Sequence, residues 1–194
     1  MGATVPESAG LYFSWGNTDG HPAGADYDFS EEKYNSTPGA AITEDLTLNH
    51  DAARVNLGAP WRMPTISEVQ ELCDNCTCVW TTLNGVNGRL FTSNINGNKL
   101  FIPAAGVCNN KSLNARGTNG YYWSSTYYTD TNAHNMTFNN TIVNPANVSW
   151  RAAGFTVRAV QDGTPKRSIV PQTLGDNQTS EIQTVEETKD ENEQ

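Results

Sequence analysis

The sequence of 194 residues lacks the features that mark several common functional classes. It has no apolar run long enough to cross a membrane, so we expect no membrane insertion. It has no basic stripe, and its 21 acidic residues outnumber 12 Lys and Arg to give a net charge of -9, which argues against a nucleic acid partner. It has no Gly-x-Ser-x-Gly elbow, no phosphate-binding loop and no suggestive pair of carboxylates. We therefore expect a protein that is not an enzyme and has no cofactor.

Cysteine is scarce, with only Cys73, Cys76, Cys78 and Cys108 in the whole chain. The Cys73-x-x-Cys76-x-Cys78 spacing has no second pair of ligands to complete a zinc site, so we expect no metal. Two interpretations remain open for the four thiols. They are buried and free, or one of the first three forms a disulfide with Cys108.

The two ends of the chain carry no folding pattern. The N-terminal MGATVPESAG has neither the basic region nor the apolar core of a signal peptide. We therefore expect a cytosolic protein, a component of a larger particle, or a chain that has lost its true N-terminus. Residues 161–194 lack periodicity and contain eight acidic and three basic residues. We predict a folded domain over 1–160, followed by a linker and an acidic, mostly disordered tail, with a docking peptide as the alternative for the tail.

Local patterns between these ends predict two short helices and a series of strands. Thr65 followed by Glu68 is a capping box, and the apolar residues after it share one helical face, which predicts a helix over 66–74. A second helix is expected around 51–55. Turn residues such as Asn84-Gly85 separate runs with a period of two. The predicted strands are 11–15, 79–83, 89–94, 99–103, 121–125, 134–139 and 155–160, with irregular loops at 20–43 and 108–119.

The segment 120–160 is apolar and aromatic at its ends and rich in Asn and Tyr in its middle. On a strand over 134–139, Met136 and Phe138 would face the core, and Asn135, Thr137 and Asn139 would face outward. Tyr and Trp can stack on sugar rings, and Asn and Asp can bind hydroxyls, so this segment predicts a display surface. We expect Trp123 in the core. The candidate ligand-binding residues are the three outward residues and eight others in flanking loops: Tyr127, Tyr128, Asp130, Asn132, Asn140, Asn144, Asn147 and Trp150.

Several motifs resemble one known family in order along most of the chain. They are GAxxPExxGxYFxWG at 2–16, WRMPTxxExxEL at 61–72, NCTxxWTTxNGVxG at 75–88, TSxxNGNxxFxPAAG at 92–106, GYYWSS at 120–125 and GFxVRxV at 154–160. This pattern is similar to the Fibrobacter succinogenes major paralogous domain, found on surface proteins of gut Bacteroidetes and in their phages. The resemblance implies an α+β, C-type-lectin-like fold: two short helices, small antiparallel sheets and long loops. It also implies that the segment before the last strand forms the ligand face.

The chain departs from this resemblance in three respects. Family members carry one more strand before the GA motif, so the fold either lacks its first strand or receives it from a neighbouring chain. The calcium site of C-type lectins is not matched, because Ala146 follows Asn144-Pro145 and Arg151 follows Trp150. The formylglycine-generating enzymes that share the fold use cysteines in their C-terminal segment, whereas three of the cysteines here follow a helix near 73.

Together these observations predict a non-enzymatic recognition domain that binds a cell-surface glycan or protein receptor. It would be a fibre or decoration protein of a phage virion, or a surface adhesin module of a bacterium, and the 161–194 tail would contact a virion or surface-assembly protein. The alternative is a structural virion or surface component without a ligand. The Asn-rich segment also fits diversification by adenine-directed mutagenesis. That hypothesis requires a template repeat and a reverse transcriptase gene beside this one.

Overall fold

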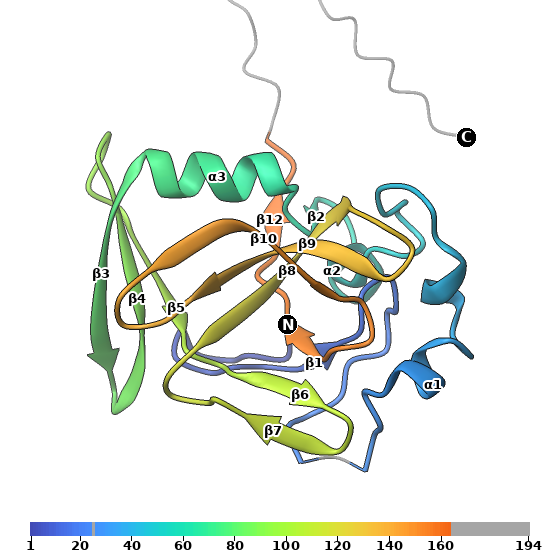
Figure 1. Ribbon diagram of the computed structural model, residues 1–194. Coiled ribbons are helices and arrows are strands. Elements are labelled where there is room, and N and C mark those ends of the chain that lie inside the picture. The colour runs from blue at the N-terminus through green and yellow to red at the C-terminus, as the bar shows by residue number, and fades with distance from the viewer. Residues whose placement is uncertain (25, 164–194) are drawn as a thin grey trace, which may run out of the picture. The chain divides into compact units, whose positions relative to one another are not determined.

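The part of the chain that the structure describes folds as a mixed α+β protein, mostly strands in several small sheets with three short α-helices (Figure 1). The computed structural model describes residues 1–24 and 26–163. The predicted tail therefore lies, from residue 164 onward, outside the described residues. No helix in the described ranges is long and apolar enough to span a membrane. The expected α+β class is confirmed.

Helix α3, Ile66–Asp74, begins where the capping box predicted. The Thr65 hydroxyl accepts a hydrogen bond from the Glu68 N–H at 3.2 Å, and the Glu68 carboxylate accepts one from the Thr65 N–H at 2.9 Å. Helix α2, Ala52–Leu57, is capped by Asp51 close to the predicted position. Helix α3 therefore forms for two reasons: its first N–H groups have side-chain acceptors, and the helix has an apolar face that packs on the core.

The loop predicted over 20–43 contains a third helix, so the expectation of two helices was wrong. Helix α1, Glu31–Tyr34, is capped by Ser30 and is followed by a 3₁₀ turn, η1, at Pro38–Ala41. Four residues are too few to show a helical period in the sequence. Tyr34 holds this region in place by donating its hydroxyl to the Trp15 carbonyl at 3.0 Å.

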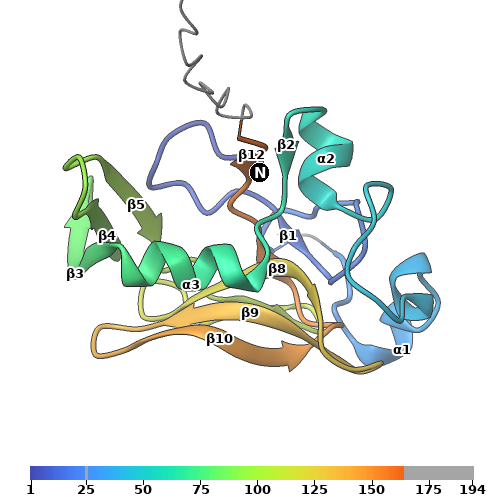
Figure 2. The same cartoon turned by 90° about the horizontal axis from the view of Figure 1, so that it is seen from above.

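The largest sheet has five strands in the order β1-β11-β8-β9-β10. Strand β11 pairs parallel to β8 and antiparallel to β1, so segments from near the two ends of the described chain meet at one edge of this sheet. Helix α3 runs along one side of the β8–β9–β10 ribbon (Figure 2). The bounds are Tyr12–Phe13 for β1, Gly120–Tyr127 for β8, Asn132–Phe138 for β9, Val143–Trp150 for β10 and Phe155–Thr156 for β11.

Strand β10 contradicts the expectation that residues 140–150 lie in loops. Asn and Pro are depleted in strands, and they occur here at Asn144, Pro145 and Asn147. An edge strand tolerates Pro because one row of its backbone groups has no partner. A register shift between Asn144 and Asn147 accommodates the irregular composition.

Three smaller sheets complete the fold. Strands β3 (Cys76–Leu83), β4 (Val86–Ser93) and β5 (Lys99–Pro103) form the predicted hairpins, with β3 longer than expected. The predicted loop at 108–119 contains the hairpin β6 (Val107–Asn109) and β7 (Ser112–Asn114). Strand β2 (Trp61–Arg62) pairs with β12 (Val160–Gln161), so the strand predicted over 155–160 is divided into β11 and β12.

Two tryptophans lock the N-terminal segment to β8. The Trp15 indole N–H donates to the Ser124 carbonyl at 2.8 Å, and the Trp123 indole N–H donates to the Phe13 carbonyl at 2.7 Å. Both side chains are buried, which confirms the core position predicted for Trp123. Reciprocal bonds of this kind fix register as well as distance, because each indole reaches a backbone group on the other segment.

The four cysteines are free thiols in the structure. Cys108 packs with Tyr12 and Phe29, whereas the other three pack against a different apolar cluster that contains Val69 and Phe138. Burial raises the pKa of Cys73 and of Cys108 to about 11. Both are therefore protonated at neutral pH.

A network of ion pairs ties α3 to β2 and to the residue after β12. Arg62 contacts Glu68 at 2.5 Å and Asp162 at 2.6 Å, and Arg54 contacts Asp162 at 2.7 Å. The hydrogen bonds from Arg62, with those from Thr65, lower the pKa of Glu68 to about 2. The network therefore joins residue 162, near the end of the described chain, to α2, β2 and α3.

We predict that this network makes stability pH-dependent. Since the pKa of Glu68 is depressed by folding, its stabilisation is present above its unfolded pKa of about 4.3 and is lost as the pH falls toward about 2. Glu68 is partly exposed, so Glu68→Gln should lower the free energy of unfolding at neutral pH by only about 1 kcal/mol. Urea unfolding across this pH range should show the difference disappearing at the acid end. Glu71→Gln, on the exposed side of α3, is the control and should change little; an equal loss at all pH values would contradict the prediction.

Candidate functional site

The exposed end of the β9–β10 pair carries a group of aromatic and polar side chains that we call the aromatic patch: Tyr128, Asn132, His134, Val148 and Trp150. Trp150 lies opposite Asn132, and Val148 lies opposite His134, so these four share one face of the sheet. The Tyr128 ring packs edge-on against His134 with 5.1 Å between centroids. Trp150 is 69% exposed and Tyr128 is 51% exposed. This face continues into Met136 and Phe138, which are buried in the cluster beside α3.

Two polar atoms of the patch are covered but have no hydrogen-bond partner among the described residues. They are Asn132 Oδ1 and His134 Nδ1. Most buried polar atoms in proteins are paired, and an unpaired one costs stability. The patch therefore combines exposed rings with two unpaired polar atoms beside them, and a rotation of the Asn132 or His134 side chain is needed before a ligand can reach these atoms.

Arg151, directly after Trp150, supports the patch from inside. Its side chain is fully buried, and its guanidinium donates to the Gly39 carbonyl at 2.5 Å and to the Asp130 carbonyl at 2.9 Å. The guanidinium carbon lies 4.5 Å from the centroid of the Trp15 ring, a cation–π distance. The turn between β8 and β9 is therefore fastened to the core through Arg151.

The same turn is closed by its own side chains. The Tyr127 hydroxyl donates to the Asp130 carboxylate at 2.6 Å, and the hydrogen bond to this carboxylate raises the pKa of Tyr127. Thr129 accepts from the Asn132 N–H at 3.1 Å, and its own N–H donates to the Asn132 carbonyl at 2.9 Å. Tyr127 and Asp130 therefore shape the turn, and Tyr128 is its exposed aromatic residue.

The outward orientation predicted for Asn135 was wrong. Asn135 is fully buried, because β9 lies between β8 and β10 and its side with Ala133 is also covered by core residues. Its amide oxygen accepts from Asn147 at 3.2 Å across the β9–β10 pair. Met136 and Phe138 are buried as predicted. Thr137 and Asn139 are half-buried, so they offer limited contact area.

The remaining predicted residues gather at the tip of the β9–β10 hairpin. Asn139 accepts from the N–H groups of Thr141 and Ile142, and Asn144 accepts from the Ala146 N–H, so both amides stabilise backbone turns. Asn140 is exposed. The tip lies six residues along the strand from Asn132, about 20 Å at the usual rise. The predicted site residues therefore fall into two groups that one small ligand cannot contact together.

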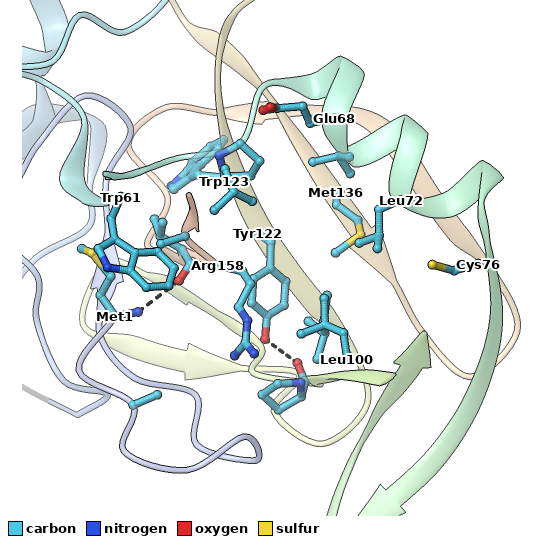
Figure 3. Close-up of a pocket in the computed structure, with 18 of the residues that line it drawn as sticks. Met1, Trp61, Glu68, Leu72, Cys76, Leu100, Tyr122, Trp123, Met136 and Arg158 are labelled. Atoms are coloured by element: carbon cyan, nitrogen blue, oxygen red, sulfur yellow. Dashed lines mark hydrogen bonds between the residues drawn. The ribbon is translucent and has the colours of Figure 1, made fainter. Parts of the chain in front are cut away.

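A second candidate site is an apolar pocket of about 800 Å³, which the sequence did not indicate (Figure 3). Its walls come from the N-terminal segment, α3, β5, β8, β9 and residues 157–160. None of the sequence-predicted site residues lines it. No sequence signal could have found it, because each lining side chain is also a plausible core residue of its own element.

Comparison with known proteins gives one partial match. A family model described as a domain of unknown function (DUF8237) matches residues 81–160, from the end of β3 into β12, less than half of the chain. No curated protein matches the chain. No solved structure matches it either. The matched range includes the whole aromatic patch but only part of the pocket wall.

We predict that Asn135 is a structural residue. Asn135→Ala should lower the free energy of unfolding by about 1–3 kcal/mol, because it removes a buried amide together with its hydrogen bond from Asn147. Asn140→Ala, at the exposed hairpin tip, is the matched control and should change it by less than about 0.5 kcal/mol. Urea denaturation measures both, and equal effects would show that Asn135 is not buried.

Arg151→Ala should be more damaging still. The substitution leaves buried carbonyls unpaired and opens a cavity beside Trp15, for an expected loss of about 3–5 kcal/mol. Arg116→Ala removes an exposed arginine of the loop after β7 and should have little effect. Thermal unfolding of both variants tests this difference.

Proposed function

We propose that this chain is a non-enzymatic recognition domain that binds a cell-surface carbohydrate or protein receptor through the aromatic patch. The observation that carries the proposal is the pair of exposed rings, Trp150 and Tyr128, on a strand pair that is otherwise firmly held. Large aromatic side chains exposed together mark interaction surfaces more often than isolated apolar residues do.

A carbohydrate suits this surface better than a purely apolar ligand. Sugar rings present C–H faces that pack on Trp and Tyr, and their hydroxyls need donors and acceptors. Asn132, opposite Trp150, and His134, packed against Tyr128, each carry a polar atom without a partner among the described residues, and side-chain rotation would present these atoms to the hydroxyls. The rigid turn beneath Tyr128 reduces the entropy lost when a ligand orders these side chains.

The C-type-lectin-like fold is part of the proposal. Its support is the way the family-like motifs meet: Trp15 and Trp123 exchange hydrogen bonds with each other's segments, and the Tyr12 and Tyr122 hydroxyls both reach carbonyls of the PAAG motif, at Ala105 and Pro103. The resemblance to the Fibrobacter succinogenes major paralogous domain is our ground for proposing that such a module acts on a bacterial surface or on the virion of a phage that infects Bacteroidetes.

Substitutions in the patch test the proposal. Trp150→Ala and Tyr128→Ala should each weaken binding to a glycan array and to whole gut Bacteroides cells at least tenfold, about 1.4 kcal/mol of binding free energy, while the free energy of unfolding stays unchanged. Trp150→Phe should retain part of the binding because it keeps a ring. Val79→Ala removes an exposed apolar side chain from β3 and is the control.

Two outcomes would count against recognition. Binding that survives in the Trp150→Ala, Tyr128→Ala double variant would move the ligand away from the patch. No binding by the intact chain, together with ordered oligomers in sedimentation, would favour a structural component of a virion or surface assembly.

A further inference from the structure

The apolar pocket has two cationic groups without a counter-ion among the described residues: the Arg158 guanidinium and the Met1 ammonium, which donates to the Val157 carbonyl at 3.0 Å. Its lining includes Val69 and Leu72 of α3, Leu100 and Ile102 of β5, and Met136 of β9. In Figure 3, Leu72, Leu100 and Met136 lie on one side of the opening, and the Arg158 side chain lies beside the Tyr122 ring. The pocket is therefore mostly apolar, and the Met1 ammonium and the Arg158 guanidinium are its cations.

Arg158 has no ion pair or side-chain hydrogen bond with any residue in the ranges 1–24 and 26–163. The two acidic residues of the lining do not supply a partner. Glu68 is held by Arg62, and Glu71 lies on the exposed side of α3. The nearby Tyr122 hydroxyl is already used, since it donates to the Pro103 carbonyl at 2.7 Å. The half-buried guanidinium can therefore accept an anion from outside the chain.

We propose that this pocket binds a medium-chain fatty acid, with its alkyl chain along α3 and β5 and its carboxylate on Arg158. A volume of about 800 Å³ with a mostly apolar lining and a few charged groups has the size and composition of small-molecule sites. An alkyl chain removes the apolar lining from water, and a carboxylate provides the planar pair of acceptors that a guanidinium binds best. The site is separate from the aromatic patch and shares none of its residues.

The experiment is isothermal titration calorimetry of the intact 194-residue chain with sodium dodecanoate, below its critical micelle concentration. We expect one bound molecule per chain. Decanoate should bind about tenfold more weakly, because it buries two fewer methylene groups. 1-Dodecanol, which has the same chain without the charge, should also bind at least tenfold more weakly.

Three protein variants test where the carboxylate and the alkyl chain of the ligand bind. Arg158→Gln should weaken dodecanoate binding at least tenfold and leave dodecanol binding unchanged; it should fold normally, because the guanidinium has no partner among the described residues. Arg116→Gln is the matched control, since this exposed arginine lies outside the pocket, and it should bind dodecanoate like the unmodified chain. Leu72→Trp should fill the pocket and abolish binding of both ligands, with circular dichroism confirming the fold.

The proposal is overturned if the intact chain does not bind dodecanoate, or if Arg158→Gln and Arg116→Gln bind it equally. It is also overturned if dodecanoate and dodecanol bind with the same affinity. A dimer in sedimentation that does not bind dodecanoate would identify a second copy of the chain as the occupant instead. Glycan or cell binding through Trp150 is measured separately and stays unchanged in Arg158→Gln.

Discussion

The buried guanidinium of Arg151 is the interaction on which the exposed end of this protein depends. Its contacts join segments that are far apart in the sequence: η1 through Gly39, the β8–β9 turn through Asp130, and β1 through the ring of Trp15 next to it. A buried charge is costly to desolvate, and here backbone carbonyls and an aromatic face compensate it instead of a carboxylate. Because carbonyls come from the backbone, the arrangement fixes where the chain runs and leaves neighbouring side chains free to vary.

The molecule therefore has two parts: a buried frame held by tertiary hydrogen bonds, and an exposed surface that includes the aromatic patch. Within the frame, the indoles of Trp15 and Trp123 and the hydroxyls of Tyr12 and Tyr122 all end on backbone carbonyls of other segments. Aromatic side chains with a polar tip suit this role, since they bury a large area and still satisfy a carbonyl in the core. A loop-rich chain with short helices gains its rigidity from such tertiary bonds more than from secondary structure.

The features that local rules govern were predictable from the sequence. The capping box located α3 to the residue, and turn dipeptides located the β3–β4–β5 hairpins, because both depend on neighbours within a few positions. Strand β10 and the burial of Asn135 were not predictable. They depend on which strand lies alongside, and neither an Asn-rich edge strand nor a buried amide carries a pattern of period two.

The candidate site was predictable only in part, because composition is a local property whereas the role of each side chain depends on its tertiary neighbours. Composition pointed to the segment 120–150, and Tyr128 and Trp150 are indeed exposed. Composition could not separate the amides that close turns, such as Asn139, from those that face a ligand, because both roles use the same hydrogen bonds. The pocket around Arg158 depends on tertiary packing alone.

Strand β10 has a further consequence for how copies of the chain behave when they are crowded. It is the outer strand of the five-stranded sheet, where a flat and regular edge would template pairing with another molecule. Pro145 removes one N–H donor from β10, and the shift between Asn144 and Asn147 breaks its regular spacing. The irregularities that made β10 hard to predict thus work against edge-to-edge pairing of sheets from different copies. At high local concentration, many copies of the chain can therefore remain separate without forming fibrils.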